Sequence, residues 1–301
     1  MHIPDGFLST PVWLALDVTA LPAAGWLARR ARREFEEARA PLLGVLGAFV
    51  FAAQMINFPV AAGTSAHLVG AALLAIALGP SAAVVVMTAI LAVQAFVFQD
   101  GGILALGANV FNMGIAGVLA AYLPYRLWGG GPRRRAAIFA AGALSVMVSA
   151  LLAICELLAS SLPVKPAALA FLLAVFAVSA VVEGIVTVAV VRAIERLSPR
   201  ILRRAPAERS WGLAACGAGA VLLAAIGGLV ASTNPDSLQW LGGQLDILGR
   251  ISTLLPAPLA DYRARWLASP WMAKAAAGCA GALLVGAICV ALGRSARTRS
   301  A

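Results

Sequence analysis

The feature that most constrains this fold is a succession of apolar stretches, each close to 20 residues long. About 20 apolar residues make one α-helical membrane crossing, and such stretches occur near residues 10–28, 41–58, 108–124, 136–158, 167–192, 211–230 and 271–293. Hydrophobic residues make up 61% of the 301-residue chain and charged residues only 12%. Because this balance is too apolar for a soluble domain, the sequence predicts an all-α integral membrane protein.

One further apolar stretch, 66–98, is too long for a single crossing. Gly79-Pro80 divides it, because proline removes a backbone donor and marks the start of a helix or a break in it. We therefore expect a short helix followed by a longer one, and about nine helices in the chain. Seven of them precede residue 200 and two follow it.

The basic residues lie mostly between these stretches, on one side of the membrane. If the N-terminus lies outside and each stretch crosses once, the interior segments near 29–39, 126–135, 192–209 and 294–299 hold 18 of the 23 lysines and arginines. Cytoplasmic segments of membrane proteins carry an excess of these residues. The expected topology has the N-terminus outside, the C-terminus in the cytoplasm and an odd number of crossings.

The segment 193–210 is the longest charged, helix-breaking part of the chain and predicts a seam between two modules. Residues 1–200 form the first module, of about seven helices. Residues 201–210 form a cytoplasmic linker. Residues 211–301 form a two-helix hairpin around an external loop, 231–270.

Histidine occurs only twice in the chain, and one of the two is residue 2. No cleavable signal peptide is evident, so we expect Met1 to keep a free amine. That amine, the His2 amide nitrogen and the His2 imidazole can close fused chelate rings on one cation. A planar nitrogen set favours nickel or copper over zinc, with cobalt also accepted. His67, expected on the same side of the membrane, is the candidate fourth ligand.

The alternative is a flexible N-terminus at His2 and an interfacial histidine at position 67 satisfied by backbone. The residues that follow favour a held terminus. Asp5-Gly6 predicts a turn directly after the ligands, and Phe7 and Leu8 are expected to anchor that turn in the bilayer. Imidazole and amine nitrogens bind metal only when deprotonated, so affinity is expected to fall on acidification.

The segment 99–114, QDGGILALGANVFNMG, combines four glycines with polar side chains. We interpret it as a loop and helix start that supports the site from outside the ligand set. The candidate supporting residues are Asp5, Gln99, Asp100, Asn109 and Asn112. A glycine-lined helix interface is the alternative.

Three carboxylates lie inside apolar stretches: Asp17, Glu156 and Glu183. Charges within the membrane are costly and mark either structural pairing or an ion path. The sequence leaves both interpretations open. Four scattered cysteines are interpreted as small packing residues.

Enzymatic motifs are missing from the sequence. It contains no G-x-x-x-x-G-K-[ST], H-E-x-x-H or G-x-S-x-G. The chain therefore lacks a nucleotide-binding loop of its own and a recognisable hydrolytic centre. We predict a transport subunit without enzymatic activity and without a catalytic residue or prosthetic group.

Three motifs closely resemble the CbiM/NikM family of cobalt and nickel transport subunits. They are MHIPDGFLS at 1–9, HLVG at 67–70 and DGGILALGANVFNMG at 100–114. The second module, with ASTNPDSLQWL at 231–241, is similar to the PDGLE-type (CbiN/NikN-like) domain fused to such subunits. Its signature reads Pro-Asp-Ser-Leu-Gln at 235–239, without the glycine and glutamate of that family.

The resemblance implies a substrate-binding S component of an energy-coupling-factor transporter in the inner (plasma) membrane. It implies metal bound by the Met1 amine, the His2 amide and imidazole, and His67. It also implies a transmembrane coupling (T) protein and two cytoplasmic ABC-type ATPases as partners, and no nucleic acid. Nickel is slightly favoured over cobalt as the transported ion. A stand-alone secondary permease for divalent cations, and a membrane metal sensor or scaffold, are the alternatives.

Overall fold

The computed structural model describes residues 1–34, 39–61, 63–197, 211–251 and 254–295. Nine of the helices in these ranges correspond to the expected ones: α1 (Thr10–Glu34), α2 (Ala40–Gln54), α3 (Ala71–Leu78), α4 (Pro80–Val93), α6 (Gly117–Trp128), α7 (Arg134–Ala159), α8 (Pro166–Leu197), α9 (Trp211–Val230) and α11 (Pro270–Arg294). Seven helical stretches within the described ranges are long and apolar enough to cross a membrane. The all-α membrane fold is thus confirmed, while the orientation of the two termini remains a prediction.

The expected break at Gly79-Pro80 is present. Helix α3 ends at Leu78 and α4 begins at Pro80, and the Gly79 between them has φ 83°. A residue with a side chain adopts this left-handed value only with strain, whereas glycine does so freely. The long apolar stretch therefore becomes two packed helices, and α3 is buried throughout its length.

Two π-helical turns flank the loop that follows α4. η2 (Gln94–Phe98) continues α4 up to this loop, and α5 (Leu106–Asn109) with η3 (Val110–Ala116) leads from it into α6. The stretch expected as one helix over 108–124 is therefore α5, η3 and α6 in series. Single π turns are frequent at functional sites, and these two place the segment 99–105 beside the N-terminus.

A short antiparallel hairpin, which the sequence did not predict, precedes His67. Its strands are β1 (Phe58–Ala61) and β2 (Thr64–Ala66), with Phe58 opposite Ala66. Strands of four and three residues are too short to show an alternating pattern. His67 directly follows the last residue of the hairpin and is buried.

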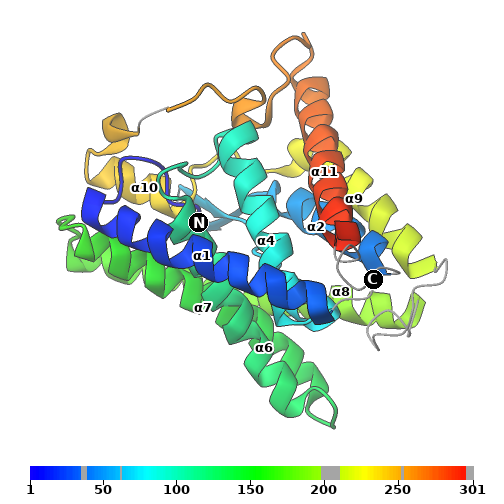
Figure 1. The fold of residues 1–301 in the computed structure, drawn as a ribbon. Coiled ribbons are helices and arrows are strands. Elements are labelled where there is room, and N and C mark those ends of the chain that lie inside the picture. The colour runs from blue at the N-terminus through cyan, green and yellow to red at the C-terminus, as the bar shows by residue number, and fades with distance from the viewer. Residues whose placement is uncertain (35–38, 62, 198–210, 252–253, 296–301) are drawn as a thin grey trace.

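The second module packs against the first through α2. At Gly44 of α2, an added Cβ would collide with Val290 and with the Gly286 backbone of α11. Small residues at such a contact let two helix backbones approach closely. Figure 1 shows α9 and α11 beside α2, on the side of the bundle away from α7.

The expected external loop at 231–270 contains structure of its own. It holds α10 (Ser237–Gln244) and two 3-10 turns, η5 (Leu248–Arg250) and η6 (Ala260–Tyr262). Main-chain hydrogen bonds join it to the first module, from Ser65 N to Pro235 O (2.9 Å) and from Leu259 N to Val97 O (3.0 Å). In Figure 1, α10 lies near the N-terminus. The expected linker at 201–210 lies outside the described residues.

Candidate metal centre

The first residues of the chain are held inside the protein. Asn109 of α5 clamps Ile3, accepting from its N–H at 2.8 Å and donating to its carbonyl at 3.1 Å. The same Ile3 carbonyl accepts from Gly102 N at 2.9 Å. Met1 and His2 are buried as well. The flexible-terminus alternative therefore does not describe this structure.

Asp5 fastens the turn that follows. Its carboxylate accepts the backbone N–H groups of Ile103 (2.9 Å), Leu104 (2.8 Å) and Ala105 (3.2 Å). The buried Asp5 thus caps the loop before α5 and ties this loop to the N-terminal segment. The neighbouring Phe7 does not anchor in the bilayer as expected, because its ring is buried against Gly242 of the second module.

The amine of Met1 lies between His67 and a carboxylate of the second module. It is 2.9 Å from His67 Nε2 and 2.5 Å from Asp236 Oδ2. His67 Nδ1 lies 2.9 Å from the carbonyl oxygen of Leu68. Since a carbonyl only accepts, the ring proton belongs on Nδ1, and Nε2 keeps a lone pair directed at the amine.

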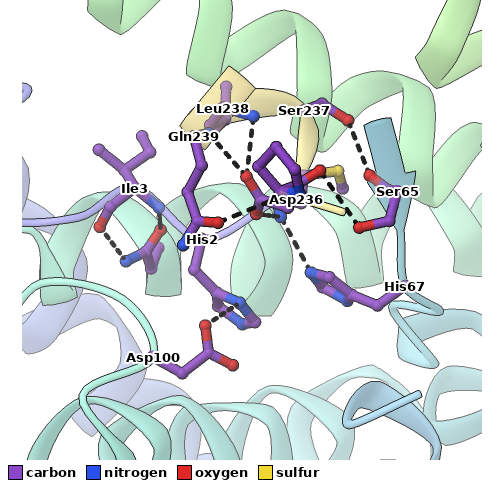
Figure 2. A network of polar contacts seen from close by, with 12 residues as sticks. His2, Ile3, Ser65, His67, Asp100, Asp236, Ser237, Leu238 and Gln239 are labelled. Carbon is purple, nitrogen blue, oxygen red and sulfur yellow. Dashed lines mark hydrogen bonds and ion pairs between the residues drawn. The ribbon is translucent and has the colours of Figure 1, made fainter. Parts of the chain in front are cut away.

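The imidazole of His2 runs nearly parallel to that of His67. The two ring centroids are 4.8 Å apart and the ring planes differ by 7°. Figure 2 shows the two labelled histidines beside each other. His2 Nδ1 lies 3.1 Å from Asp100 Oδ1. His2 Nε2 is buried without a hydrogen-bond partner in the described parts of the chain, an arrangement that calls for an explanation in a native protein.

The two carboxylates of the centre stay ionised because of their neighbours. Burial alone acts to raise the pKa of Asp100, but the adjacent His2 and the hydroxyl of Tyr262, 2.6 Å away, outweigh it and hold the pKa below its usual range. At Asp236, burial likewise acts to raise the pKa, and the amine of Met1 outweighs it.

His67 is kept neutral by its surroundings. Burial is the main cause that lowers the pKa of this imidazole, and the positive charge of the neighbouring amine lowers it further. A neutral ring is the form that binds metal ions. The site therefore presents a metal-ready imidazole beside two negative charges.

Two polar cavities border the centre, with volumes of about 210 and 190 Å³. His67 lines the first and His2 the second. The two cavities share five of their lining residues, which come from the 99–100 loop and from the second module. These are Gln99, Asp100, Asp236, Gln239 and Asp261. Gln99 and Asp100 thus lie at the site.

Asn112, the remaining supporting candidate, lies elsewhere. It donates to Glu156 Oε2 of α7 at 2.8 Å and lines neither cavity. Asp17 accepts from Gly107 N at 2.6 Å. Each carboxylate that the sequence left open between pairing and an ion path is thus hydrogen-bonded in the structure, Glu183 included.

Sequence reasoning missed Asp236 and Tyr262 as parts of the centre. Asp236 carries a local signal for a different role, because its carboxylate also caps α10 in a capping box with Gln239. Tyr262 carries no such signal. Only the fold of the 231–270 segment brings either residue to the N-terminus.

The site does not consist of a conventional cluster of metal-binding side chains in the part of the chain that the structure describes. In the described ranges, no group of three His, Cys, Asp or Glu side chains is arranged to hold a metal ion. The nitrogen donors brought together include main-chain atoms, the Met1 amine and the adjoining His2 amide.

Comparison with known proteins agrees with this architecture. Residues 2–201 match the CbiM family, described as the cobalt uptake substrate-specific transmembrane region. The putative fused nickel transport protein NikMN of Archaeoglobus fulgidus is 35% identical over 99% of this chain and 100% of its own. The fused nickel transport protein NikMN of Rhodobacter capsulatus is 31% identical over the full length of both chains.

A solved structure is similar in fold as well. The crystal structure of a truncated transition metal transporter aligns with a TM-score of 0.59 and 32% identity, covering 65% of this chain and 99% of that chain. The family match spans the first module, and the fused relatives extend over the second. This multi-pass membrane protein therefore belongs to the CbiM family, as a CbiM/NikM-type module fused to a NikN-like module.

Proposed function

We propose that this chain captures nickel or cobalt ions for uptake, as the substrate-binding subunit of an energy-coupling-factor transporter. The observation that carries the proposal is the buried amine of Met1, 2.9 Å from His67 Nε2, with the His2 ring parallel alongside. Two nitrogens bound to neighbouring corners of one metal ion at ~2.0 Å lie ~2.8 Å apart. The amine and His67 already have this spacing.

The covalent structure of the N-terminus supplies the other two donors. An ion on the Met1 amine and the His2 amide nitrogen closes a five-membered ring, and His2 Nδ1 adds a six-membered ring. In the structure, His2 Nδ1 faces Asp100 at 3.1 Å. For His2 Nδ1 to bind the metal ion, Asp100 must therefore give up this contact.

Nickel is the favoured ion. Four nitrogens in a plane, one of them an ionised amide, match the tetragonal preference of Ni²⁺ better than that of Zn²⁺. The names of the two full-length relatives, both nickel transport proteins, support the same choice. Cobalt is the second candidate.

Transport requires an energy source outside this chain. The sequence has no nucleotide-binding G-x-x-x-x-G-K-[ST] motif. We assign ATP hydrolysis to two cytoplasmic ABC-type ATPases, connected to this subunit by a transmembrane coupling protein. Residues 1–200 act as the metal-binding module, and residues 211–301 as an accessory module that reaches the site through Asp236.

The position of the amine at the chain terminus gives the sharpest test. One alanine added before Met1 converts this amine into a peptide nitrogen. We therefore expect the affinity for Ni²⁺ and Co²⁺, measured by calorimetry, to fall by at least tenfold. X-ray absorption should detect four nitrogen donors in the native protein and fewer in the extended one. A matched protein with one alanine added after residue 301 serves as control. Equal affinity of the native and N-terminally extended proteins would disprove this ligand assignment.

Uptake assays separate the transport mechanism from metal capture. Cells that express this chain with the coupling protein and ATPases should accumulate ⁶³Ni, and cells with ATPases inactivated in their nucleotide site should not. Uptake by the chain alone, at the same rate, would instead identify a stand-alone permease.

A further inference from the structure

We propose that Glu183, in the middle of α8, is a positioning residue that sets the orientation and donor strength of His67. The inference rests on the proposed metal site. Glu183 is 2% exposed, and both of its carboxyl oxygens are used. Oε2 accepts from Val69 N at 2.8 Å and Oε1 accepts from Gly70 N at 2.7 Å.

One peptide group connects Glu183 with the His67 ring. The N–H of Val69 and the carbonyl of Leu68 belong to the same peptide unit. The N–H donates to Glu183, and the carbonyl oxygen lies 2.9 Å from His67 Nδ1. The contacts therefore run in series from carboxylate to peptide to imidazole, and the far nitrogen of that imidazole, Nε2, faces the Met1 amine.

This series acts on the metal-binding nitrogen in two ways. A histidine that binds metal through one nitrogen is oriented, and made more basic, by the acceptor on its other nitrogen. Hydrogen bonds in a chain polarise one another in a medium of low dielectric constant. A carboxylate on the peptide N–H strengthens the carbonyl as acceptor, which in turn favours the proton on Nδ1 and a free lone pair on Nε2.

The peptide group between Val69 and Gly70 is held by a second helix, α2. Gln54 of α2 donates through Nε2 to the Val69 carbonyl at 2.7 Å, and Gln54 Oε1 accepts from Gln94 at 2.8 Å. Val69 is thus fixed at its N–H by α8 and at its carbonyl by α2. Of the two side chains that hold Val69, Glu183 is the acidic one and Gln54 the neutral one.

A purely structural role is the competing explanation, because the carboxylate also caps the start of α3 at Gly70. The two roles differ in what happens when His67 is missing. A positioning effect disappears with the histidine through which it acts, whereas damage to the fold persists.

A double-mutant cycle for Ni²⁺ affinity tests the assignment on the full-length protein. Glu183→Gln preserves side-chain volume but places an amide against backbone donors, so we expect about tenfold weaker binding, the usual cost of losing support around a metal ligand. In the His67→Ala background the same change should cost less than twofold. Glu195→Gln, on the same helix but paired with Arg134, is the matched control and should leave affinity unchanged.

A second variant covers the case in which Glu183→Gln does not fold. Glu183→Asp keeps the charge and withdraws the oxygens by one methylene, and should weaken binding to a similar extent. The Ni²⁺ ligand-field spectrum should shift towards that of the His67→Ala protein in either variant. If the Glu183 variants bind Ni²⁺ as tightly as the wild type, the positioning role is overturned. It is also overturned if they lose the same factor in affinity with His67 present and with His67→Ala. Affinity that is insensitive to His67→Ala overturns the proposed metal site together with it.

Discussion

The amine of Met1 and the carboxylate of Asp236 form an ion pair at 2.5 Å, although the two residues are 235 positions apart. Both groups are largely buried, with side-chain exposures of 6% and 14%. The pair joins the two modules at the proposed metal site. It also means that an incoming ion meets an amine already engaged by the accessory module.

The first prediction concerns this ion pair. The amine must leave its contact with this carboxylate before it can react with an acylating reagent. Asp236→Asn removes the charge of that partner and should therefore raise the acylation rate of the Met1 amine roughly tenfold, a change equivalent to about 1.4 kcal/mol. Peptide mass spectrometry after timed labelling measures this rate. Glu195→Gln, which removes a charge that is paired with Arg134, should leave the rate unchanged, and equal rates in all three proteins would contradict the pairing.

The second prediction concerns the turn at Gly6. Its φ is +90°, and an added Cβ would collide with the carbonyl of Arg250. Gly6→Ala should therefore displace the N-terminal segment, weakening Ni²⁺ binding by at least tenfold and destabilising the protein by about 2 kcal/mol. Gly63→Ala is the matched control, because it has φ +77° but open space around it. Similar Ni²⁺ affinities of the two variants would show that contact with the second module is unimportant.

Asp5 provides the third prediction. Asp5→Ala leaves three backbone N–H groups without their acceptor, and each unsatisfied buried group costs about 1–3 kcal/mol. We expect the free energy of unfolding to fall by about 3 kcal/mol, which should appear as a lower melting temperature in detergent. Asp5→Asn retains one acceptor oxygen and should melt between the alanine variant and the wild type. A melting temperature unaffected by Asp5→Ala would argue against the anchoring role.

The fourth prediction is a pH dependence. Burial and the nearby amine lower the pKa of His67, so this imidazole is neutral from about pH 5.5 to 7.5 and takes up no competing proton there. Affinity should still fall on acidification, because the amine and the His2 amide must lose protons to the solvent when they bind the ion. The slope of log affinity against pH should therefore be equal for wild type and His67→Ala in calorimetric titrations. A slope shallower by about one proton in the variant would place a protonated His67 in that range.

Local patterns were sufficient for much of the fold. Apolar stretches of membrane-crossing length and the break at Gly79-Pro80 predicted the helices, because helix length and proline geometry depend on neighbouring residues alone. The hairpin at 58–66 and the structure within 231–270 escaped prediction. Their elements are short, and long-range hydrogen bonds to distant segments hold them in place.

The sequence by itself determined the candidate ligands, because a histidine at position 2 shares a chelate ring with the terminal amine whatever the fold. Only the tertiary structure placed His67 against that amine, Asp236 beside it and Glu183 behind it. These contacts join residues separated by 66 to 235 positions in the chain. Their geometry depends on how α2, α8 and the 231–270 segment pack, and no local pattern carries that information.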